Sequence, residues 1–569
     1  MVSVDFTDVL IVGAGPIGLV TALGLAQQGI DTLLIEKRDA KKHETFGRAA
    51  SIHPRTLELL EQVDITDELL QAGAIHHSYS SYRNGKPIFL KGMQSVFLGY
   101  KASFHSYALS VRQAITQTIV ASKYKTDFNK SVHHEWELVD LKVDTEIQDD
   151  YNVTATISHV SLGERTIRCK YIVGADGTQS TVRQLAGIDM VGDETSYKWV
   201  RLDGKFKTDI PGIEDGGATV ESDGHPHLFI FRLDGDSYRI GYTLTQQQLD
   251  KYPEGPTQEQ CMFEAIEAIK PFKLEFERLD WWTIYRIKQK VAAFFQKDEY
   301  VLLAGDSCHT HSSGMAQGMN TGIHDATNLI WKLSGQLKGW YKSDVLATYD
   351  PERRKIAQKV IDIDRLMATC MSGDLPEAYK SLGMNRYEVM NQVAQANASF
   401  NSGIGVSYEE TTSVVLSEAR AGTWSIGLRC ADELVKHPGP SVPVRLQSII
   451  HKSKGRWNVL VFASNPLKTR DRFKALRVKM TAQGSSFIKR AHMMRVYTLI
   501  IGSVSSVWDA FEGPALGRLY FDPEGLAHAG YGIPHDGTII VIRPDGIVAF
   551  AAGLHQLDEV EEFFDGFCA

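Results

Sequence analysis

Hydrophobic positions near the start of the chain follow two different periods. Residues 8–12 form a short apolar run that ends at Gly13, residues 17–28 carry Ala and Leu at helical spacing, and residues 32–35 form a second apolar run that ends at Glu36. Short apolar runs bounded by glycine are typical of buried strands, whereas repeats of three and four residues are typical of a helix. The pattern predicts a strand, a tight turn, a helix and a second strand.

Three glycines and one carboxylate indicate what this βαβ unit binds. Gly13 permits the turn, Gly15 lets the backbone approach a pyrophosphate, and Gly18 lets the helix and strand pack closely. The helix N-terminus supplies amide donors, and Glu36 lies where a carboxylate accepts hydrogen bonds from a ribose. FAD or NAD fits this carboxylate, which would repel a 2′-phosphate. An ordinary glycine-containing turn is the alternative, and the matching spacing of strand, helix and acid disfavours it.

A second segment lies in the middle of the chain. Residues 170–174 have the pattern of a buried strand, and Asp176 and Gly177 follow in a turn. A helix-capping Asp in a surface turn is the alternative interpretation. The sequence has no second glycine fingerprint followed by a strand and an acid. A nicotinamide cofactor is therefore expected to bind transiently.

A third segment combines a strand, an acidic turn and a helix start. Residues 300–304 form an apolar strand, Gly305 frees the turn, and Asp306 places a carboxylate where it can hold a ribityl hydroxyl of a flavin. A helix is expected from about Met319, with its N-terminus toward the flavin. A helix N-terminus stabilises the negative charge of a reduced flavin by about 0.3–1 kcal/mol. The alternative interpretation of this segment is an ordinary helix cap without a ligand.

Size and charge restrict the remaining possibilities. The chain has 569 residues, of which 43% are hydrophobic and 23% are charged. Roughly two to four domains are expected for this length. A net charge of -8 without a basic stripe gives no electrostatic case for nucleic acid or an anionic membrane. Residues 9–28 are uncharged, but their glycines favour a strand, turn and helix over a membrane span.

Cysteine and histidine positions argue against disulfides and metals. The six cysteines lie far apart with no CxxC, as in a reducing compartment, and no signal peptide is recognised, so we expect a cytoplasmic protein. Cys308, His309 and His311 lie on one turn, which seldom closes a tetrahedral site. We expect no metal. The sequence also lacks the GxSxG elbow of an acyl-transfer nucleophile.

Together these segments resemble a known family. GAGPIG with Glu36, GADGTQSTVR and GDSCHTHSSGMAQGMN are similar, in this order, to the three signatures of class A (single-component) FAD-dependent aromatic hydroxylases, and in particular the phenol 2-monooxygenase group. The resemblance covers most of the chain. It implies an α/β fold in which a Rossmann-like FAD-binding domain of the para-hydroxybenzoate hydroxylase type is interleaved with a mixed-sheet substrate-binding domain.

The resemblance also implies the domain bounds. The FAD-binding domain is expected at 1–76, 106–190 and 297–370, the substrate-binding domain at 77–105 and 191–296, a helical connection at 371–420, and a thioredoxin-like domain at 421–569. The last domain lacks CxxC, so we expect a packing or dimer role for it rather than disulfide exchange. A homodimer is the expected assembly.

Cofactor contacts and chemistry follow from the same resemblance. Besides the three glycines, Glu36 and Asp306, it assigns FAD contacts to Arg48, Ala50, Arg112, Gln113, Asp176, Gly177, Ala316, Gln317, Gly318, Met319 and Asn320. NADPH or NADH is expected to reduce FAD. Dioxygen then gives a flavin C4a-hydroperoxide, which hydroxylates a phenolic small molecule in a pocket that excludes water.

The sequence departs from the group at three positions. Ala50 stands where the group has an acidic residue, Gly241 where it has a tyrosine, and Ser313 where it has a proline. Loss of a carboxylate and a ring is expected to enlarge the pocket, so we predict a bulky or polyketide-derived phenol.

Candidate pocket residues are less specific than the cofactor contacts. They are Arg232, Tyr238, Tyr242, Tyr285 and His53, although strand tyrosines are usually core and a lone histidine is usually a satisfied polar group. Alternatives to hydroxylation are Baeyer-Villiger insertion, epoxidation, dehydrogenation, and flavin binding without turnover, because the motifs bind flavin without specifying the substrate.

Overall fold

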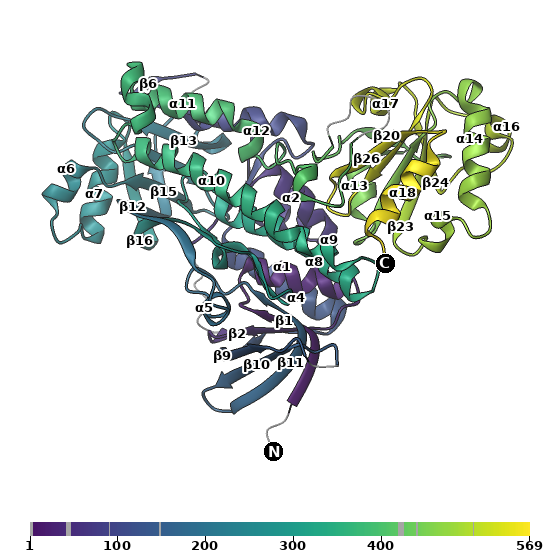
Figure 1. Cartoon of the computed structure of the whole chain (residues 1–569). Coiled ribbons are helices and arrows are strands. Elements are labelled where there is room, and N and C mark those ends of the chain that lie inside the picture. Colours follow the sequence, from purple (N-terminus) through teal and green to yellow (C-terminus); the bar gives the residue numbers. More distant parts are fainter. Residues whose placement is uncertain are drawn as a thin grey trace. The chain divides into compact units, whose positions relative to one another are not determined.

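The computed structural model describes residues 4–40, 47–89, 92–146, 149–418, 426–439, 442–504 and 506–569. Its contacts divide the chain into two compact units. The first contains Met1–Ala26, Asp31–Ala326 and Arg353–Gly405, and the second contains Gln27–Ile30, Thr327–Glu352 and Val406–Ala569. Figure 1 labels many of their elements. The finer domain bounds stay predictions, and the expected boundary between residues 420 and 421 lies outside the described residues.

An eight-stranded sheet in the first unit contains the predicted βαβ element. Its order is β17-β18-β11-β1-β2-β8, with β10 joining β9 to β11. Strand β1 is parallel to both β2 and β11, and it is longer than predicted because Val4 already pairs with Thr166 of β11. The strands are β1 (Val4–Val12), β2 (Thr32–Glu36), β8 (His133–His134), β9 (Trp136–Val143), β10 (Val153–His159), β11 (Gly163–Gly174), β17 (Gln296–Lys297) and β18 (Val301–Leu303).

A second eight-stranded sheet has the order β19-β16-β12-β15-β14-β13-β5-β6. One face of it packs on a buried core that includes Val200, Leu202 and Ile240. The strands are β5 (Ser78–Arg83), β6 (Lys86–Pro87), β12 (Met190–Thr208), β13 (Gly216–Glu221), β14 (Leu228–Arg232), β15 (Tyr238–Thr243), β16 (Leu274–Ala292) and β19 (His309–Thr310).

A small sheet and several helices complete the first unit. The sheet has the order β3-β7-β4, with β3 (Ser51–Ile52), β4 (Ala74–His76) and β7 (Ala108–Ser110). The helices are α1 (Pro16–Gln27), α2 (Pro54–Leu60), α3 (Thr66–Ala72), α4 (Gln113–Phe128), α5 (Thr181–Leu185), α6 (Gln246–Lys251), α7 (Gln258–Ala268), α11 (Arg386–Ala396) and α12 (Ala398–Asn401). Helices α8 (Gln317–Leu337) and α10 (Tyr349–Met371) begin in one unit and end in the other.

Small residues bring α1 and α8 together near their N-termini. A Cβ atom added to Gly305 would lie 2.9 Å from Cγ1 of Ile17, and one added to Gly322 would lie 2.6 Å from the same atom. The glycines therefore let Ile17 of α1 pack against the start of α8 and the turn before it. Helix α8 begins at Gln317, two residues before the predicted start.

The second unit is built on a seven-stranded sheet of order β21-β20-β24-β23-β22-β25-β26. Its strands are β20 (Leu434–Lys436), β21 (Pro443–Arg445), β22 (Trp457–Phe462), β23 (Met494–Ile501), β24 (Arg518–Asp522), β25 (Thr538–Ile542) and β26 (Val548–Gly553). Its helices are α9 (Ser343–Ala347), α13 (Leu446–His451), α14 (Pro466–Thr481), α15 (Ser486–Lys489), α16 (Val507–Phe511), α17 (Leu526–Gly530) and α18 (Leu557–Phe567).

Its central strands have the connectivity of a thioredoxin-like sheet. Strands β22 and β23 are parallel, and β25 and β26 form an antiparallel hairpin beside β22. The hairpin forms around the predicted Pro-Asp-Gly turn at 544–546. The prediction of an α/β fold is confirmed.

Candidate functional site

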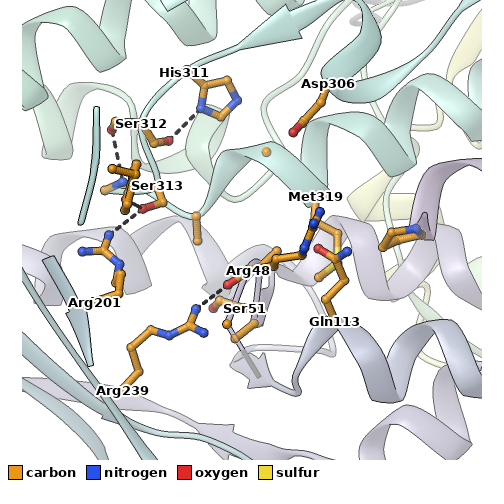
Figure 2. A pocket seen from close by; sticks show the side chains of 18 of the residues that line it. Arg48, Ser51, Gln113, Arg201, Arg239, Asp306, His311, Ser312, Ser313 and Met319 are labelled. Carbon is orange, nitrogen blue, oxygen red and sulfur yellow. Dashed lines mark hydrogen bonds between the residues drawn. The ribbon is translucent and has the colours of Figure 1, made fainter. Parts of the chain in front are cut away.

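The first unit contains a cavity of about 670 Å³ that all three sequence signatures help to line. Its wall includes the β1–α1 turn, the end of β11, and the segment between β18 and α8. The face of the second sheet that carries Arg201 and Arg239 forms another part of the wall. Figure 2 shows these side chains with Asp306, Met319 and Gln113 around the same space.

The β1–α1 turn has the geometry expected of a dinucleotide cradle. Gly13 has a φ of +101°, and its N–H donates to the carbonyl of Ile35 over 2.8 Å. A Cβ atom on Gly18 would lie 1.9 Å from the carbonyl oxygen of Gly13, whereas one on Gly15 would meet nothing within 4 Å. Gly18 is therefore required by packing, and Gly15 leaves space beside the helix N-terminus.

Glu36 is held in place by the same turn. Its Oε2 accepts a hydrogen bond from the N–H of Ala14 at 2.9 Å, and its Oε1 accepts one from the N–H of Arg38 at 3.0 Å. The carboxylate lines the cavity at the end of β2. This is where the sequence places a ribose acceptor.

Asp176 contributes a buried oxygen that has no partner. Its Oδ2 accepts from the N–H groups of Thr181 at 2.7 Å and Val182 at 3.2 Å. Asp176 therefore does cap the following helix, as the alternative interpretation holds. Its Oδ1, however, is buried and makes no hydrogen bond in the described part of the chain. Burial also raises the pKa of this carboxyl group. Because buried polar atoms are normally paired, the cavity beside Asp176 fits a polar ligand.

Asp306 points into the cavity from a turn that a buried ion-pair network supports. Gly305 donates its N–H to Oδ2 of Asp325 at 3.1 Å, and Asp325 also pairs with His309 at 2.7 Å and with Arg353 at 2.8 Å. Asp306 itself is exposed to the cavity and makes no hydrogen bond or ion pair with any residue that the structure describes. Its carboxylate is available to a ligand.

The network behind Asp306 includes three groups whose ligand atoms lie within 4.8 Å of one another, Cys308, His309 and Asp325. Both oxygens of Asp325 are engaged by cationic or N–H groups, and burial raises the pKa of the Cys308 thiol well above its ordinary value. A metal requires a thiolate and free lone pairs. We therefore assign these side chains to support of the turn.

Fourteen of the sequence-predicted residues line the cavity. They are Gly13, Gly15, Glu36, Arg48, Ala50, His53, Gln113, Asp176, Gly177, Tyr285, Asp306, Ala316, Gly318 and Met319. Arg48 and Ala316 both have positive φ angles, +58° and +53°. Such backbone strain in non-glycine residues is concentrated at ligand sites.

Three predicted FAD contacts are not among the residues that line the cavity, and their side chains bind other parts of the protein. Arg112 forms an ion pair with Asp234, to which its Nε donates over 2.6 Å. Gln317 donates to the carbonyl of Asn401 over 2.8 Å. Asn320 accepts from the N–H of His53 and donates to the carbonyls of Ser51 and Ala316, so it ties the first turn of α8 to β3.

Three predicted pocket residues do not line the cavity, and their assignment is corrected. Tyr242 is 1% exposed and donates to the carbonyl of Cys261 over 2.8 Å, while Tyr238 packs against the same core. Successive side chains on a strand face opposite sides, so on β15 Arg239 lies on the cavity wall and the two tyrosines do not. Arg232, at the end of β14, is exposed away from the lining residues.

The space left by Gly241 is filled, which corrects the expectation of a larger pocket at this position. A Cβ atom on Gly241 would lie 2.2 Å from Cζ of Phe229 and 2.4 Å from Nη1 of Arg201. Nη2 of Arg201 donates to Oγ of Ser313 over 2.5 Å (Figure 2). Ser313 also hydrogen-bonds the hydroxyl of Tyr285. Two of the three positions that depart from the group, Gly241 and Ser313, thus meet at the guanidinium of Arg201.

His53 is a satisfied polar group in the wall. Its Nε2 donates to the carbonyl of Met315 over 3.2 Å, so its Nδ1 accepts from the hydroxyl of Tyr100 over 2.6 Å. Burial lowers the pKa of His53 to about 4 and raises that of Tyr100 well above its ordinary value. The pair is therefore neutral near pH 7.

The sequence prediction missed much of the wall. The missed side chains are Tyr79, Phe97, Tyr100, Arg201, His227, Phe229, Phe231, Arg239 and Trp281. The alternation of Arg201 with Val200 and Leu202 in β12 was the available signal, because a charge within an apolar strand has to face a polar group or a ligand.

The whole-chain comparisons give two family matches. The description "FAD binding domain" matches residues 6–364, and "Phenol hydroxylase, C-terminal dimerisation domain" matches residues 503–569. No helix in the part of the chain that the structure describes is long and apolar enough to cross a membrane.

Named relatives align over nearly the whole chain. "FAD-dependent monooxygenase ankC" of Aspergillus thermomutatus is 26% identical, with 97% of this chain and 96% of the relative covered. "3-hydroxybenzoate 4-monooxygenase" of Comamonas testosteroni is 27% identical, with 98% of this chain and 94% of the relative covered.

Solved structures share the fold. The monooxygenase PieE in complex with FAD and substrate has a TM-score of 0.73 at 18% identity, and 98% of each chain is covered. Aklavinone-11 hydroxylase with FAD and aklavinone has a TM-score of 0.70 at 21% identity, with 98% of each chain covered. The first family match spans more than half of the 569 residues. The prediction of a flavoprotein with a phenol-hydroxylase-type C-terminal domain is confirmed, and the chain belongs to the FAD-binding domain family, with FAD as its cofactor.

Proposed function

We propose that this protein is a monooxygenase that uses NADPH or NADH and dioxygen to hydroxylate a phenolic compound. One observation carries the proposal: a single cavity joins the dinucleotide cradle at Gly15 to a chamber with aromatic walls. The chamber side chains are Tyr79, Phe97, Tyr100, Phe229, Phe231, Trp281 and Tyr285. Apolar and aromatic walls with a few polar groups are what a planar aromatic ligand requires.

The cradle residues have separate tasks toward FAD. The open backbone at Gly15 would receive the pyrophosphate at the N-terminus of α1, Glu36 would accept from the adenosine ribose, and Asp306 would accept from the ribityl chain. Ala316 and the first turn of α8, fixed by Asn320, would support the flavin ring. When bound, FAD supplies reductive activation of dioxygen with electrons from the nicotinamide.

The chamber residues orient the substrate ring and exclude water. The rings of Phe229 and Phe231 both line the cavity, with their centroids 5.9 Å apart and an interplanar angle of 21°, so they give this part of the wall an aromatic surface. Burial lowers the pKa of His53 to about 4, and its Nδ1 already accepts from the hydroxyl of Tyr100, so His53 is a weak base. Both oxygens of Asp203 accept from Arg239, so this carboxylate is not free to act as a base either. The hydroxyls of Tyr285 and Ser313 remain to hydrogen-bond a phenolic oxygen.

The substrate is proposed to be a bulky or polyketide-derived phenol. Ala50 is small and lines the cavity, so the space of the absent acid is available. Similar proteins carry names such as "Phenol 2-monooxygenase fsqG" and "OxyS anhydrotetracycline hydroxylase". These names support phenolic, multi-ring chemistry for this chain.

The test is substrate-dependent oxidation of NADPH and NADH across phenols from one ring to four, with products weighed after reaction under ¹⁸O₂. A hydroxylase adds one labelled oxygen to a ring carbon. Loss of two hydrogens without label would instead indicate dehydrogenation, and label in a new ester would indicate Baeyer-Villiger insertion. A protein that retains FAD but oxidises no nicotinamide with any phenol would defeat the proposal.

We also propose a cytoplasmic homodimer. The match of residues 503–569 to a dimerisation domain supports self-association, and all six cysteines are buried and free of disulfides, as suits a reducing compartment. Sedimentation equilibrium tests the dimer, and a mass equal to one chain at all concentrations would contradict it.

A further inference from the structure

Arg201 is a buried cation on the chamber wall that lacks a counter-charge. Its side chain comes from the middle of β12, and the residue is 4% exposed. Its guanidinium donates to two neutral acceptors, Oγ of Ser313 over 2.5 Å and the carbonyl of Val200 over 3.1 Å. In the part of the chain that the structure describes, no carboxylate lies within ion-pair distance of it.

The nearby carboxylate of Asp203 is already committed. Both of its oxygens accept from Arg239, at 2.7 Å each, and Oδ2 also accepts from the N–H of Gly47 at 3.2 Å. Two guanidiniums therefore share one carboxylate on this face of the sheet. Burial lowers the pKa of Arg201 to about 10, which still leaves it charged at neutral pH.

The surroundings hold Arg201 in place without neutralising it. Its Cζ lies 4.5 Å from the ring centroid of Phe229, 4.9 Å from that of Trp199 and 5.7 Å from that of Tyr285. Gly241 opposite it on β15 is what makes room, because a Cβ there would lie 2.4 Å from Nη1. Ring faces stabilise a cation partly, but they do not replace an anion.

A buried guanidinium without a counter-charge destabilises the protein unless a ligand supplies the negative charge. Arginine has five N–H donors in a planar fork that suits oxyanions. Among the residues that the structure describes, Arg201 donates only two hydrogen bonds. We propose that Arg201 binds an anionic oxygen group of the aromatic substrate, and so selects aromatic anions over neutral aromatics. That this ligand is a substrate rests on the proposed hydroxylase function.

Ligand binding to the FAD-loaded protein tests the charge preference directly. The probes are 6-hydroxy-2-naphthoate and its methyl ester, followed through perturbation of flavin absorbance. The wild type is expected to bind the acid at least tenfold more tightly than the ester, and Arg201→Gln is expected to lose this preference. Arg278→Gln, on β16 with a half-exposed side chain, is the matched control and should retain it.

The anion has two chemical sources, which a second probe separates. For 4-nitrophenol titrated through its own pKa, tighter binding of the ionised form to the wild type but not to Arg201→Gln indicates a phenolate. A preference confined to the naphthoate pair indicates a carboxylate. Equal binding of acid and ester together with equal binding of neutral and ionised 4-nitrophenol by the wild type, or no binding of any anionic probe, overturns the proposal. Anion-selective binding without oxygen transfer would defeat only the hydroxylase.

Stability of the ligand-free holoenzyme gives an independent test. Arg201→Met removes an unpaired charge and should leave the thermal midpoint unchanged or higher. Arg239→Met strands the buried Asp203 carboxylate and should lower the midpoint. If Arg201→Met lowers the midpoint as much as Arg239→Met does, Arg201 is a structural residue and the proposal fails.

Discussion

Two glycines three residues apart should respond very differently to the same added methyl group. At Gly15, on the cavity wall, a Cβ meets no atom within 4 Å. At Gly18 a Cβ would lie 1.9 Å from the carbonyl oxygen of Gly13, a backbone atom that cannot rotate away. Gly15→Ala should therefore alter only the ligand site, whereas Gly18→Ala should force the turn and the helix apart.

The size of each effect follows from what the methyl displaces. At Gly15 it occupies the path of the pyrophosphate and removes at least one charged hydrogen bond, about 1.5–3 kcal/mol. That energy corresponds to a roughly 10- to 150-fold rise in the Kd for FAD. At Gly18 overpacking should cost the apoprotein about 1–3 kcal/mol of stability, with weaker FAD binding as a consequence.

The assay uses apoprotein for both variants. FAD titration followed by quenching of flavin fluorescence gives the Kd, and thermal denaturation of the apoprotein reports folding separately. Gly15→Ala with wild-type FAD affinity would refute the placement of the pyrophosphate. A lower apoprotein midpoint for Gly15→Ala would refute the claim that its Cβ meets open space.

Other expectations concern charged and titrating groups. Asp306→Ala should weaken FAD binding by about 1.5–3 kcal/mol without changing the apoprotein midpoint, because no described residue pairs with Asp306; unchanged affinity would remove it from the ribityl site. Asp203→Asn should lower the free energy of unfolding in urea by about 3–5 kcal/mol, since it leaves Arg239 buried without its partner; an unchanged midpoint would contradict this. The pKa of His53 falls from 6.5 to about 4 on folding, so its stabilising contribution is complete above pH 6.5 and is lost as the pH falls through 4. Its size is about 3 kcal/mol, and His53→Gln should flatten the pH dependence of unfolding by this amount; an identical pH profile would show that His53 is not the titrating group.

Much of the cofactor side was predictable from local patterns. The strand, turn and helix at residues 4–27 and the carboxylates Glu36 and Asp306 form through short-range spacing that can be read from the sequence. Their roles follow because a strand end, a glycine turn and a helix N-terminus meet within a few residues of each other. Most of the predicted cofactor residues accordingly line one cavity.

The chamber side was not predictable in the same way. The side of β15 that faces the chamber depends on its register with β12, and a shift of one residue would have exchanged Arg239 for Tyr238. Phe229 and Arg201, from two other strands, fill the space beside Gly241. The absence of the tyrosine that the group has at this position therefore does not enlarge the cavity there.

The sequence by itself therefore determined the α/β class, the FAD fingerprint and the acids that surround it, because these depend on neighbours along the chain. The tertiary structure alone decided that Arg201, Gly241 and Ser313 meet, and that no carboxylate of the described residues lies within ion-pair distance of the buried Arg201 guanidinium. Residues from β12, β15 and the segment before α8 are brought together only by strand pairing and packing, which no local pattern specifies.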